Sequence, residues 1–220
     1  MTDAPDDTDQ SLKPAELAAF LAARLCHDFI SPASAIVSGL DLLEDPTAQD
    51  MREEAMGLIS SSARKLADLL SFCRVAFGAS ASAQTFDPRE LATLAQGVFR
   101  HMRAELVWDA DMPAVSKPVA RTLLNLAQMA GAALPTGGTA TVRLAEAGGL
   151  VDITVEAVGP RARLRPEVLA GLQGQGPGEG MHGHWVQARY VSLLVADAGG
   201  TVSAEAGEER VVLTAQLKLD

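Results

Sequence analysis

The sequence has little cysteine: only Cys26 and Cys73 among 220 residues, each inside an apolar helical pattern. Small secreted domains are stabilised by several disulfides, so a disulfide framework is excluded and a reducing compartment is the simpler interpretation. Basic residues are also few, with 18 Lys and Arg against 28 Asp and Glu and a formal net charge of −10. Because nucleic-acid binders need cationic surface to meet phosphates, we predict no nucleic-acid partner.

The sequence also lacks long hydrophobic runs and a basic, apolar leader. No uninterrupted apolar stretch is long enough to span a bilayer, and residues 1–10 are acidic and polar, unlike a signal peptide. We therefore expect a cytoplasmic chain with no membrane partner. With 48% apolar and 21% charged residues, the chain has enough apolar side chains for a core in one or two domains.

The first half of the chain has helical periodicity. Residues 1–12 are acidic and predict a disordered tail. Apolar residues then recur at steps of three or four from Pro14 to about Glu44 and from about Ala48 to Phe77, which predicts two long antiparallel helices over residues 13–79. Their apolar stripes are too wide for one hairpin to bury. We therefore predict a homodimer, in which two hairpins form a four-helix bundle.

A small-residue linker at residues 78–84 predicts a domain boundary, with a second domain over 80–220. After this linker the long helical periodicity ends, and shorter helix and strand patterns follow. We predict helices over 87–102, 117–134 and 185–196, a strand at 106–108, hairpins over 140–158 and 201–219, and a glycine-rich loop over 171–183. The fold class is therefore α+β: a helical hairpin followed by a domain in which helices pack on a mixed sheet.

The best candidates for reactive side chains lie in one segment, Arg24-Leu-Cys-His-Asp-Phe-Ile-Ser-Pro32. A helix turns about 100° per residue, so His27 points away from the apolar stripe, with Arg24 and Ser31 one turn away. A neutral imidazole is a competent nucleophile; Asp28 can orient it, and Arg24 can pair with phosphoryl oxygens. From spacing alone, however, an exposed structural histidine remains the favoured interpretation.

A resemblance to a known family reverses that preference. This segment resembles the H-box of histidine kinases, with an acidic residue after the His and a proline five positions on. The second half resembles their Bergerat-type ATP-binding domain: Asp87-Pro-Arg-Glu-Leu-Ala, Arg121-Thr-Leu-Leu-Asn-Leu and Val155-Glu-Ala-Val-Gly-Pro fall in the expected order. The sequence around His27 is most similar to that of the ChpT-type histidine phosphotransferases of alphaproteobacteria. The resemblance implies a dimerising phosphotransfer hairpin and an α/β sandwich.

The departures from the kinase pattern concern the nucleotide site. The second asparagine of the N-box, a Mg²⁺ ligand in the family, is Met129, although Asn125 retains the first. The aspartate that accepts from adenine is Ala157, and Arg161 stands for a glycine. A thioether is a poor ligand for a hard cation, and an alanine cannot accept that hydrogen bond. We therefore predict no cofactor and no metal on this chain, and no ATP-dependent autophosphorylation.

The resemblance then implies a phosphorelay function. His27 would accept a phosphoryl group from a receiver-domain aspartate of a CckA-type hybrid histidine kinase and pass it to response regulators of the CtrA and CpdR type, with Mg²⁺ supplied by the receiver. Cell-cycle control is the implied process. The alternatives are an ATP-dependent histidine kinase with a divergent nucleotide site and a non-catalytic scaffold that binds receivers.

The predicted docking surface lies around the histidine, with a small apolar patch and a polar rim. Its predicted members are Phe20, Phe29, Ser31, Ala35, Ser38, Lys65 and Leu69, with Arg161, Arg163 and Arg165 as a second, minority surface. His182 and His184 have metal-like spacing but no evident third ligand, so we interpret them as incidental loop histidines.

Overall fold

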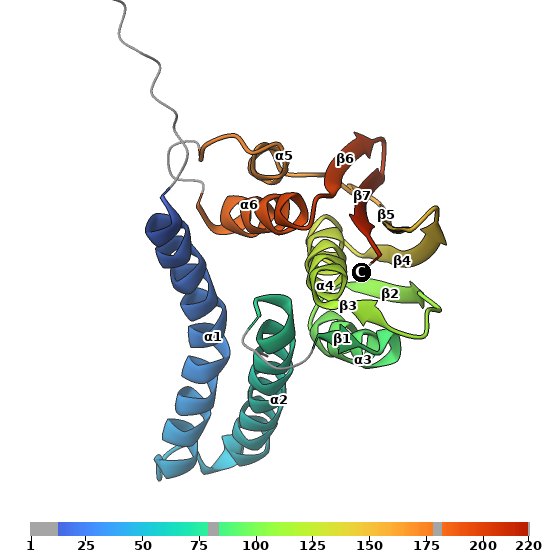
Figure 1. The fold of residues 1–220 in the computed structure, drawn as a ribbon. Coiled ribbons are helices and arrows are strands. Elements are labelled where there is room, and N and C mark those ends of the chain that lie inside the picture. The colour runs from blue at the N-terminus through green and yellow to red at the C-terminus, as the bar shows by residue number, and fades with distance from the viewer. Residues whose placement is uncertain (1–12, 79–83, 178–181, 220) are drawn as a thin grey trace, which may run out of the picture.

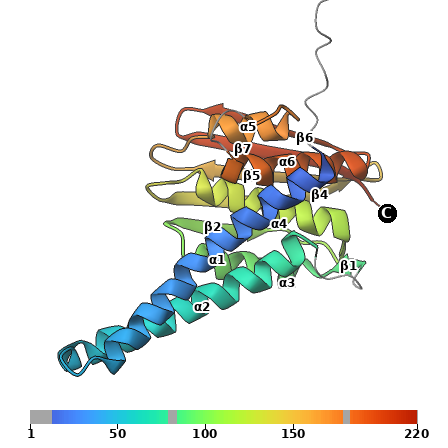
Figure 2. The ribbon, with the colours of Figure 1, turned by 90° about the vertical axis from the view of Figure 1, so that its left-hand side faces the viewer.

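The computed structural model describes residues 13–78, 84–177 and 182–219. The predicted tail, most of the predicted linker and residues 178–181 of the glycine-rich loop lie outside the described residues. The α+β class is confirmed: a helical hairpin stands beside a domain of helices and a sheet (Figure 1). The hairpin runs alongside α6 and α4, and its turn extends beyond the second domain (Figure 2).

Two long helices build the hairpin, as predicted. Helix α1 spans Pro14–Glu44 and α2 spans Arg52–Ala76, with a short 3-10 turn, η1 (Gln49–Met51), between them. Pro14 begins α1, where the missing N–H is not needed, and Pro32 lies buried inside it without interrupting the helix. The helices approach closely at Gly39, where a Cβ would stand 2.6 Å from Ile59 Cγ1.

Helix α1 leaves most of its apolar surface uncovered. By length and composition alone it could cross a membrane, although the sequence has no uninterrupted apolar run, and only 6% of its most apolar window is buried. The core helices of other proteins pass the same test, so this property alone does not place the chain in a membrane. Apolar side chains remain on the outside of the hairpin, including Ile30 at 62% and Val37 at 55% exposure.

The second domain contains a five-stranded sheet in the order β2-β4-β5-β7-β6. Its strands are β2 (Ala104–Asp109), β4 (Gly138–Ala147), β5 (Leu150–Val158), β6 (Thr201–Gly207) and β7 (Arg210–Lys218). Only the β2–β4 pair is parallel, which confirms a mixed sheet. Gly148 and Gly149 both have positive φ in the tight turn between β4 and β5, the geometry a two-residue hairpin requires.

Helices cover one face of this sheet and separate it from the hairpin (Figure 1). They are α3 (Pro88–Phe99), α4 (Lys117–Ala132), α5 (Pro166–Leu172) and α6 (His182–Asp197). Asp87 accepts a hydrogen bond from the Arg89 backbone N–H at 2.8 Å and caps α3, with Pro88 at the first position. Alternate residues of β5 and β7 are buried beneath α4 and form the centre of the core.

Four elements differ from the sequence prediction in their existence or in where they begin. Helix α5 begins where no element was predicted and ends inside the predicted glycine-rich loop, and α6 begins at His182 inside that loop. Strands β1 (Thr85–Phe86) and β3 (Val115–Ser116) pair with each other. Seven- and two-residue elements carry too little periodicity to be detected from sequence.

The hairpin and the second domain share one core. Phe72, Val75 and Ala76, at the end of α2, are buried in the same cluster as the side chains of α3 and α4. The Asp68 carboxylate lies 3.0 Å from His101 Nε2, just beyond α3. These contacts fix the side of α1 that faces α4 and α6.

Candidate functional site

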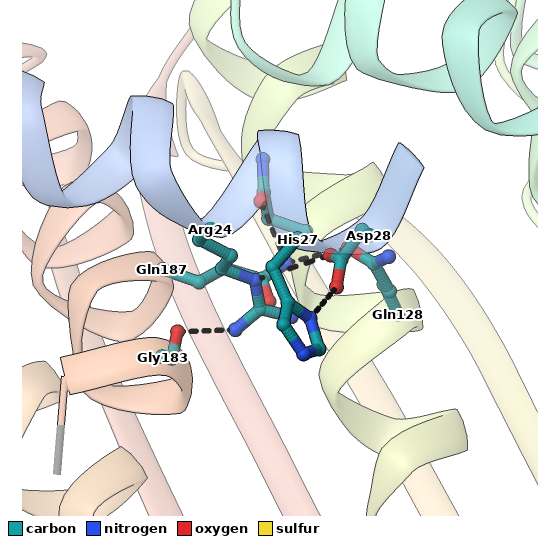
Figure 3. Close-up of polar contacts among 7 residues, drawn as sticks. Arg24, His27, Asp28, Gln128, Gly183 and Gln187 are labelled. Carbon is teal, nitrogen blue, oxygen red and sulfur yellow. Dashed lines mark hydrogen bonds and ion pairs between the residues drawn. The ribbon is translucent and has the colours of Figure 1, made fainter. Parts of the chain in front are cut away.

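His27 stands on the face of α1 that points toward α6, and its side chain is 86% exposed (Figure 3). Its Nδ1 lies 3.4 Å from Oδ1 of Asp28, a long and therefore weak contact. An N–H at Nδ1 directed at this carboxylate leaves Nε2 unprotonated and open to solvent. The predicted exposure of the imidazole is confirmed.

Arg24, one turn before Asp28, connects the histidine to α6. Its Nε lies 3.6 Å from Asp28 Oδ2, and its Nη1 donates to the carbonyl oxygen of Gly183 in the first turn of α6 (Figure 3). The side chain is only 13% exposed, and burial lowers the pKa of the guanidinium, which remains charged. Arg24 therefore holds the start of α6 against α1, and its remaining N–H groups are available to an anion.

A cavity of about 340 Å³ opens beside His27, between the hairpin and the second domain. The hairpin contributes Arg24, Asp28, Ser31, Lys65 and Leu69 to its lining. The second domain contributes Val98, His101, Met102, Gln128, Met129, Ala132, Ala133, Arg163, Leu164, Arg165, Val168, His184 and Gln187. The predicted phospho-acceptor thus lies at a composite site, built from both halves of the chain.

His184 faces the same space as His27, since both line this cavity and a neighbouring one at Phe20. Burial, followed by the positive charges of Arg24 and Arg165, lowers the pKa of His184. Glu167 and Asp28 oppose that shift. The imidazole is therefore neutral near pH 7 and can donate or accept a hydrogen bond.

Asn125 is fully buried behind the cavity wall rather than directed into it. Its amide nitrogen donates to the carbonyl oxygens of Ala76 at 3.0 Å and Arg121 at 2.9 Å, and its Oδ1 accepts from Gln187 Nε2 at 2.9 Å. The same Gln187 nitrogen lies 2.7 Å from Gln128 Oε1 (Figure 3). The side chain that resembles a nucleotide-site asparagine thus joins α4 to α2 and α6.

The other departures from the kinase pattern also have clear positions. Met129 is 5% exposed and forms part of the cavity wall. Ala157 lies on β5, and its side chain is fully buried in the core. Arg161 adopts a φ of 61° in the turn after β5, a left-handed conformation in which the family has glycine. None of these three side chains offers an oxygen ligand.

The predicted docking residues fall into three groups. Ser31, Lys65, Leu69, Arg163 and Arg165 line the cavity with His27, and Phe20 lines the neighbouring one. Phe29 lies in a separate apolar groove with Leu25, Leu70 and Phe77. Ala35 and Ser38 lie further along α1, and Arg161 is exposed; these three residues are not part of the cavity lining.

Sequence reasoning missed Gln128, Gln187, His101 and His184 as lining residues. His184 was interpreted as an incidental loop histidine, but it stands in the first turn of α6 beside Arg24. The only signal in the sequence was its spacing from His182, which is typical of metal ligands and does not indicate this cavity. Within the described residues, no group of three or more His, Cys, Asp and Glu side chains is arranged to hold a metal ion.

Comparison with known proteins assigns this architecture to a class. The model of the family described as "Histidine phosphotransferase C-terminal domain" matches residues 88–210. Together with the hairpin and its exposed histidine, this match shows that the chain belongs to the histidine phosphotransferase family.

Particular relatives agree with that class. The chain is 36% identical over 207 residues to "Protein phosphotransferase ChpT" from Brucella abortus (strain 2308), covering 94% of this chain and 98% of that protein. A solved "Bacterial Phosphotransferase" superimposes with a TM-score of 0.83 at 35% identity, covering 93% of this chain and 97% of the other.

Proposed function

We propose that this chain is a phosphorelay intermediate that accepts a phosphoryl group on His27 and passes it to a second receiver domain. The observation that carries the proposal is the exposed imidazole at the mouth of a cavity lined by basic side chains. The relay has a simple exchange of bonds. His27 Nε2 forms a bond to phosphorus as the bond from phosphorus to the aspartyl oxygen breaks, and the donor aspartate leaves as a carboxylate.

The protons need no external acceptor in this step. The Nδ1 proton stays on the ring and faces Asp28, whose negative charge stabilises the phosphorylated imidazolium. Basic side chains around the cavity, including Arg163 and Arg165, stabilise the charge of the transferring group. The second step reverses the first: an acceptor aspartate oxygen forms the new bond as the Nε2–phosphorus bond breaks.

We propose that the phosphoryl donor is a protein and not ATP. Asn125 is buried and engaged with α2 and α6, Met129 offers sulfur in place of oxygen, and Ala157 presents a methyl group to the core. These positions support a chain that binds neither cofactor nor metal. The Mg²⁺ needed for transfer would come with the acidic pocket of the receiver.

The proposed partners are the receiver domain of a CckA-type hybrid kinase and response regulators of the CtrA and CpdR type, acting in cell-cycle control in the cytoplasm. Docking would centre on Phe20, Ser31, Lys65 and Leu69, since they surround His27. Arg163 and Arg165 would extend this surface onto the second domain, because they line the same cavity.

We propose further that the hairpin pairs with a second copy of itself. Seven of the ten large hydrophobic side chains that are exposed in the described part of the chain lie on the hairpin: Ile30, Val37, Leu40, Met51, Met56, Leu58 and Leu70. Fully burying one such side chain is worth about 1.5–3 kcal/mol, so a four-helix bundle would be strongly favoured.

A radiolabel experiment tests the relay. The full chain is incubated with a labelled phosphorylated receiver, or separately with labelled ATP, and the His27→Gln variant is run beside it. We expect acid-labile, alkali-stable label from the receiver on the wild-type chain alone. Label arriving from ATP without a donor would support the kinase alternative. An effect of the chain on receiver output that survives His27→Gln would support the scaffold.

A further inference from the structure

The cavity beside His27 is larger than a phosphoryl group requires. Its volume of about 340 Å³ falls in the range of small-molecule sites. A phosphoaspartate on a folded receiver brings its phosphoryl group to the exposed imidazole but has no small apolar body to fill the space behind it. The inner part of the cavity therefore has room for a separate ligand.

The charges of the cavity wall select an anion. Arg24, Lys65, Arg163 and Arg165 supply four positive charges to the cavity lining, whereas Asp28 supplies the single carboxylate among the described lining residues. The whole chain carries a formal net charge of −10, so this basic surface is local. A concave site with one sign of charge concentrates ions of the opposite sign.

The remaining wall is apolar. It is formed by Leu69, Val98, Met102, Met129, Ala132, Ala133, Leu164 and Val168. Gln187 is only 2% exposed and donates from Nε2 to Asn125 and Gln128. Its Oε1 receives no hydrogen bond from another described residue, so it can accept one from an occupant. The wall thus offers charge for a head group, apolar contact for a body and one acceptor.

We propose that this cavity binds a small phosphate monoester with an apolar or aromatic body, and that its occupancy keeps receivers away from His27. The phosphate head lies against Arg163, Arg165 and His184, and the body lies against Met129 and Val168. The binding claim stands on the cavity itself, whereas the inhibition claim rests on the proposed relay, because the same arginines would meet both the ligand and the receiver.

Binding is tested on the full chain by isothermal titration calorimetry with three probes: phenyl phosphate, phenol and inorganic phosphate. We expect one saturable site for phenyl phosphate, with each of the other probes weaker by about tenfold or more. The double variant Arg163→Ala/Arg165→Ala should also lower the affinity for phenyl phosphate by about tenfold or more. Arg89→Ala, which removes an exposed arginine on α3 outside the lining, is the matched control and should leave the affinity unchanged.

Each alternative outcome overturns a defined part of the proposal. Equal binding of phenol would show an apolar cavity with no anion selectivity, and equal binding of inorganic phosphate would show a head-group site that does not use the apolar wall. No saturable binding of phenyl phosphate would overturn the proposal even if label still moved from a receiver to His27. Saturable binding that leaves the transfer rate unchanged would overturn the inhibition claim, whereas absence of any transfer to His27 would overturn the relay and leave the binding result intact.

Discussion

Asn125 on α4 donates a hydrogen bond to the carbonyl oxygen of Ala76 in the last turn of α2, over 3.0 Å. Both residues are fully buried, so the bond joins the hairpin to the second domain out of reach of water. In the histidine-kinase pattern that this chain resembles, an asparagine at this place belongs to the nucleotide site. Here the same side chain fixes the orientation of the two halves, and with it the position of the cavity beside His27.

This bond predicts a stability effect for Asn125→Ala. Removing the amide leaves the Ala76 carbonyl without this buried donor, while Gln187 keeps only its bond to Gln128, so we expect a loss of about 1–3 kcal/mol in the free energy of unfolding. Urea denaturation measures it. Thr122→Val on the same helix is the control: the Thr122 hydroxyl is buried without a hydrogen-bond partner among the described residues, so its removal should be neutral or stabilising. Unchanged stability of Asn125→Ala would contradict the proposed role.

Asp28→Asn tests the carboxylate beside the imidazole. The amide keeps the shape but loses the negative charge that faces Nδ1 and Arg24. We expect transfer from a phosphorylated receiver to slow by about tenfold or more, because the charged phosphohistidine loses its counter-ion, while His27 is still labelled at long times. Rapid-quench kinetics gives the rate. Asp41→Asn, an exposed carboxylate on the same helix outside the cavity lining, should transfer at the wild-type rate.

The two glycines inside the hairpin helices, Gly39 on α1 and Gly57 on α2, predict opposite effects on stability. At Gly39 an added Cβ would stand 2.6 Å from Ile59 Cγ1 and 3.1 Å from the Ala55 carbonyl oxygen, so Gly39→Ala should separate the helices and destabilise by about 1–3 kcal/mol. At Gly57 nothing lies within 4 Å, so Gly57→Ala should stabilise by about 0.5–1 kcal/mol through helix propensity. Thermal unfolding of both variants at one protein concentration measures the pair. A stabilising Gly39→Ala would show that the close approach has no energetic consequence.

The apolar side chains on the outside of the hairpin predict association. Val37 is 55% exposed on α1, and Val37→Lys places a charge where a second hairpin would pack. We expect sedimentation at micromolar concentration to give a dimer for the wild type and a monomer for this variant. Val107→Lys, at 47% exposure on β2, is the matched control and should remain dimeric. A monomeric wild type at that concentration would contradict the proposed dimer.

The sequence predicted the long elements well because their periodicity is strong. Both hairpin helices, α4 and the β4–β5 hairpin were expected close to their observed bounds. Helix α5 was missed because seven residues next to a glycine-rich stretch show no repeat. The 3-10 turn before α2 was also missed, because a single turn of three residues is too short to show a repeated apolar pattern.

The site was predictable only where it lies on one helix. Arg24, His27 and Asp28 are related by helical geometry, so their grouping follows from sequence spacing. Gln128 and Gln187 meet across 2.7 Å from two different helices, α4 and α6. Such a contact depends on how the helices pack on the sheet, and periodicity within one helix carries no information about it. The burial of Asn125 escaped prediction for the same reason.

His184 predicts an acid-sensitive step in stability. Its pKa lies below the ordinary 6.5 because of burial first, then the charges of Arg24 and Arg165, against the opposing charges of Glu167 and Asp28. The folded chain therefore binds this proton less readily than the unfolded chain does. The resulting stability is present above the unfolded pKa and is lost as the pH falls through the folded one.

The measurement is urea unfolding at about pH 7.5 and about pH 5.5, on either side of an ordinary histidine pKa. We expect the wild type to lose more stability on acidification than His184→Gln, because the glutamine takes up no proton. Arg165→Gln should reduce the difference by removing one of the charges that lower the pKa. An NMR titration of the His184 ring gives the folded pKa directly. A midpoint at or above 6.5 would contradict the environment described for this side chain beside Arg24.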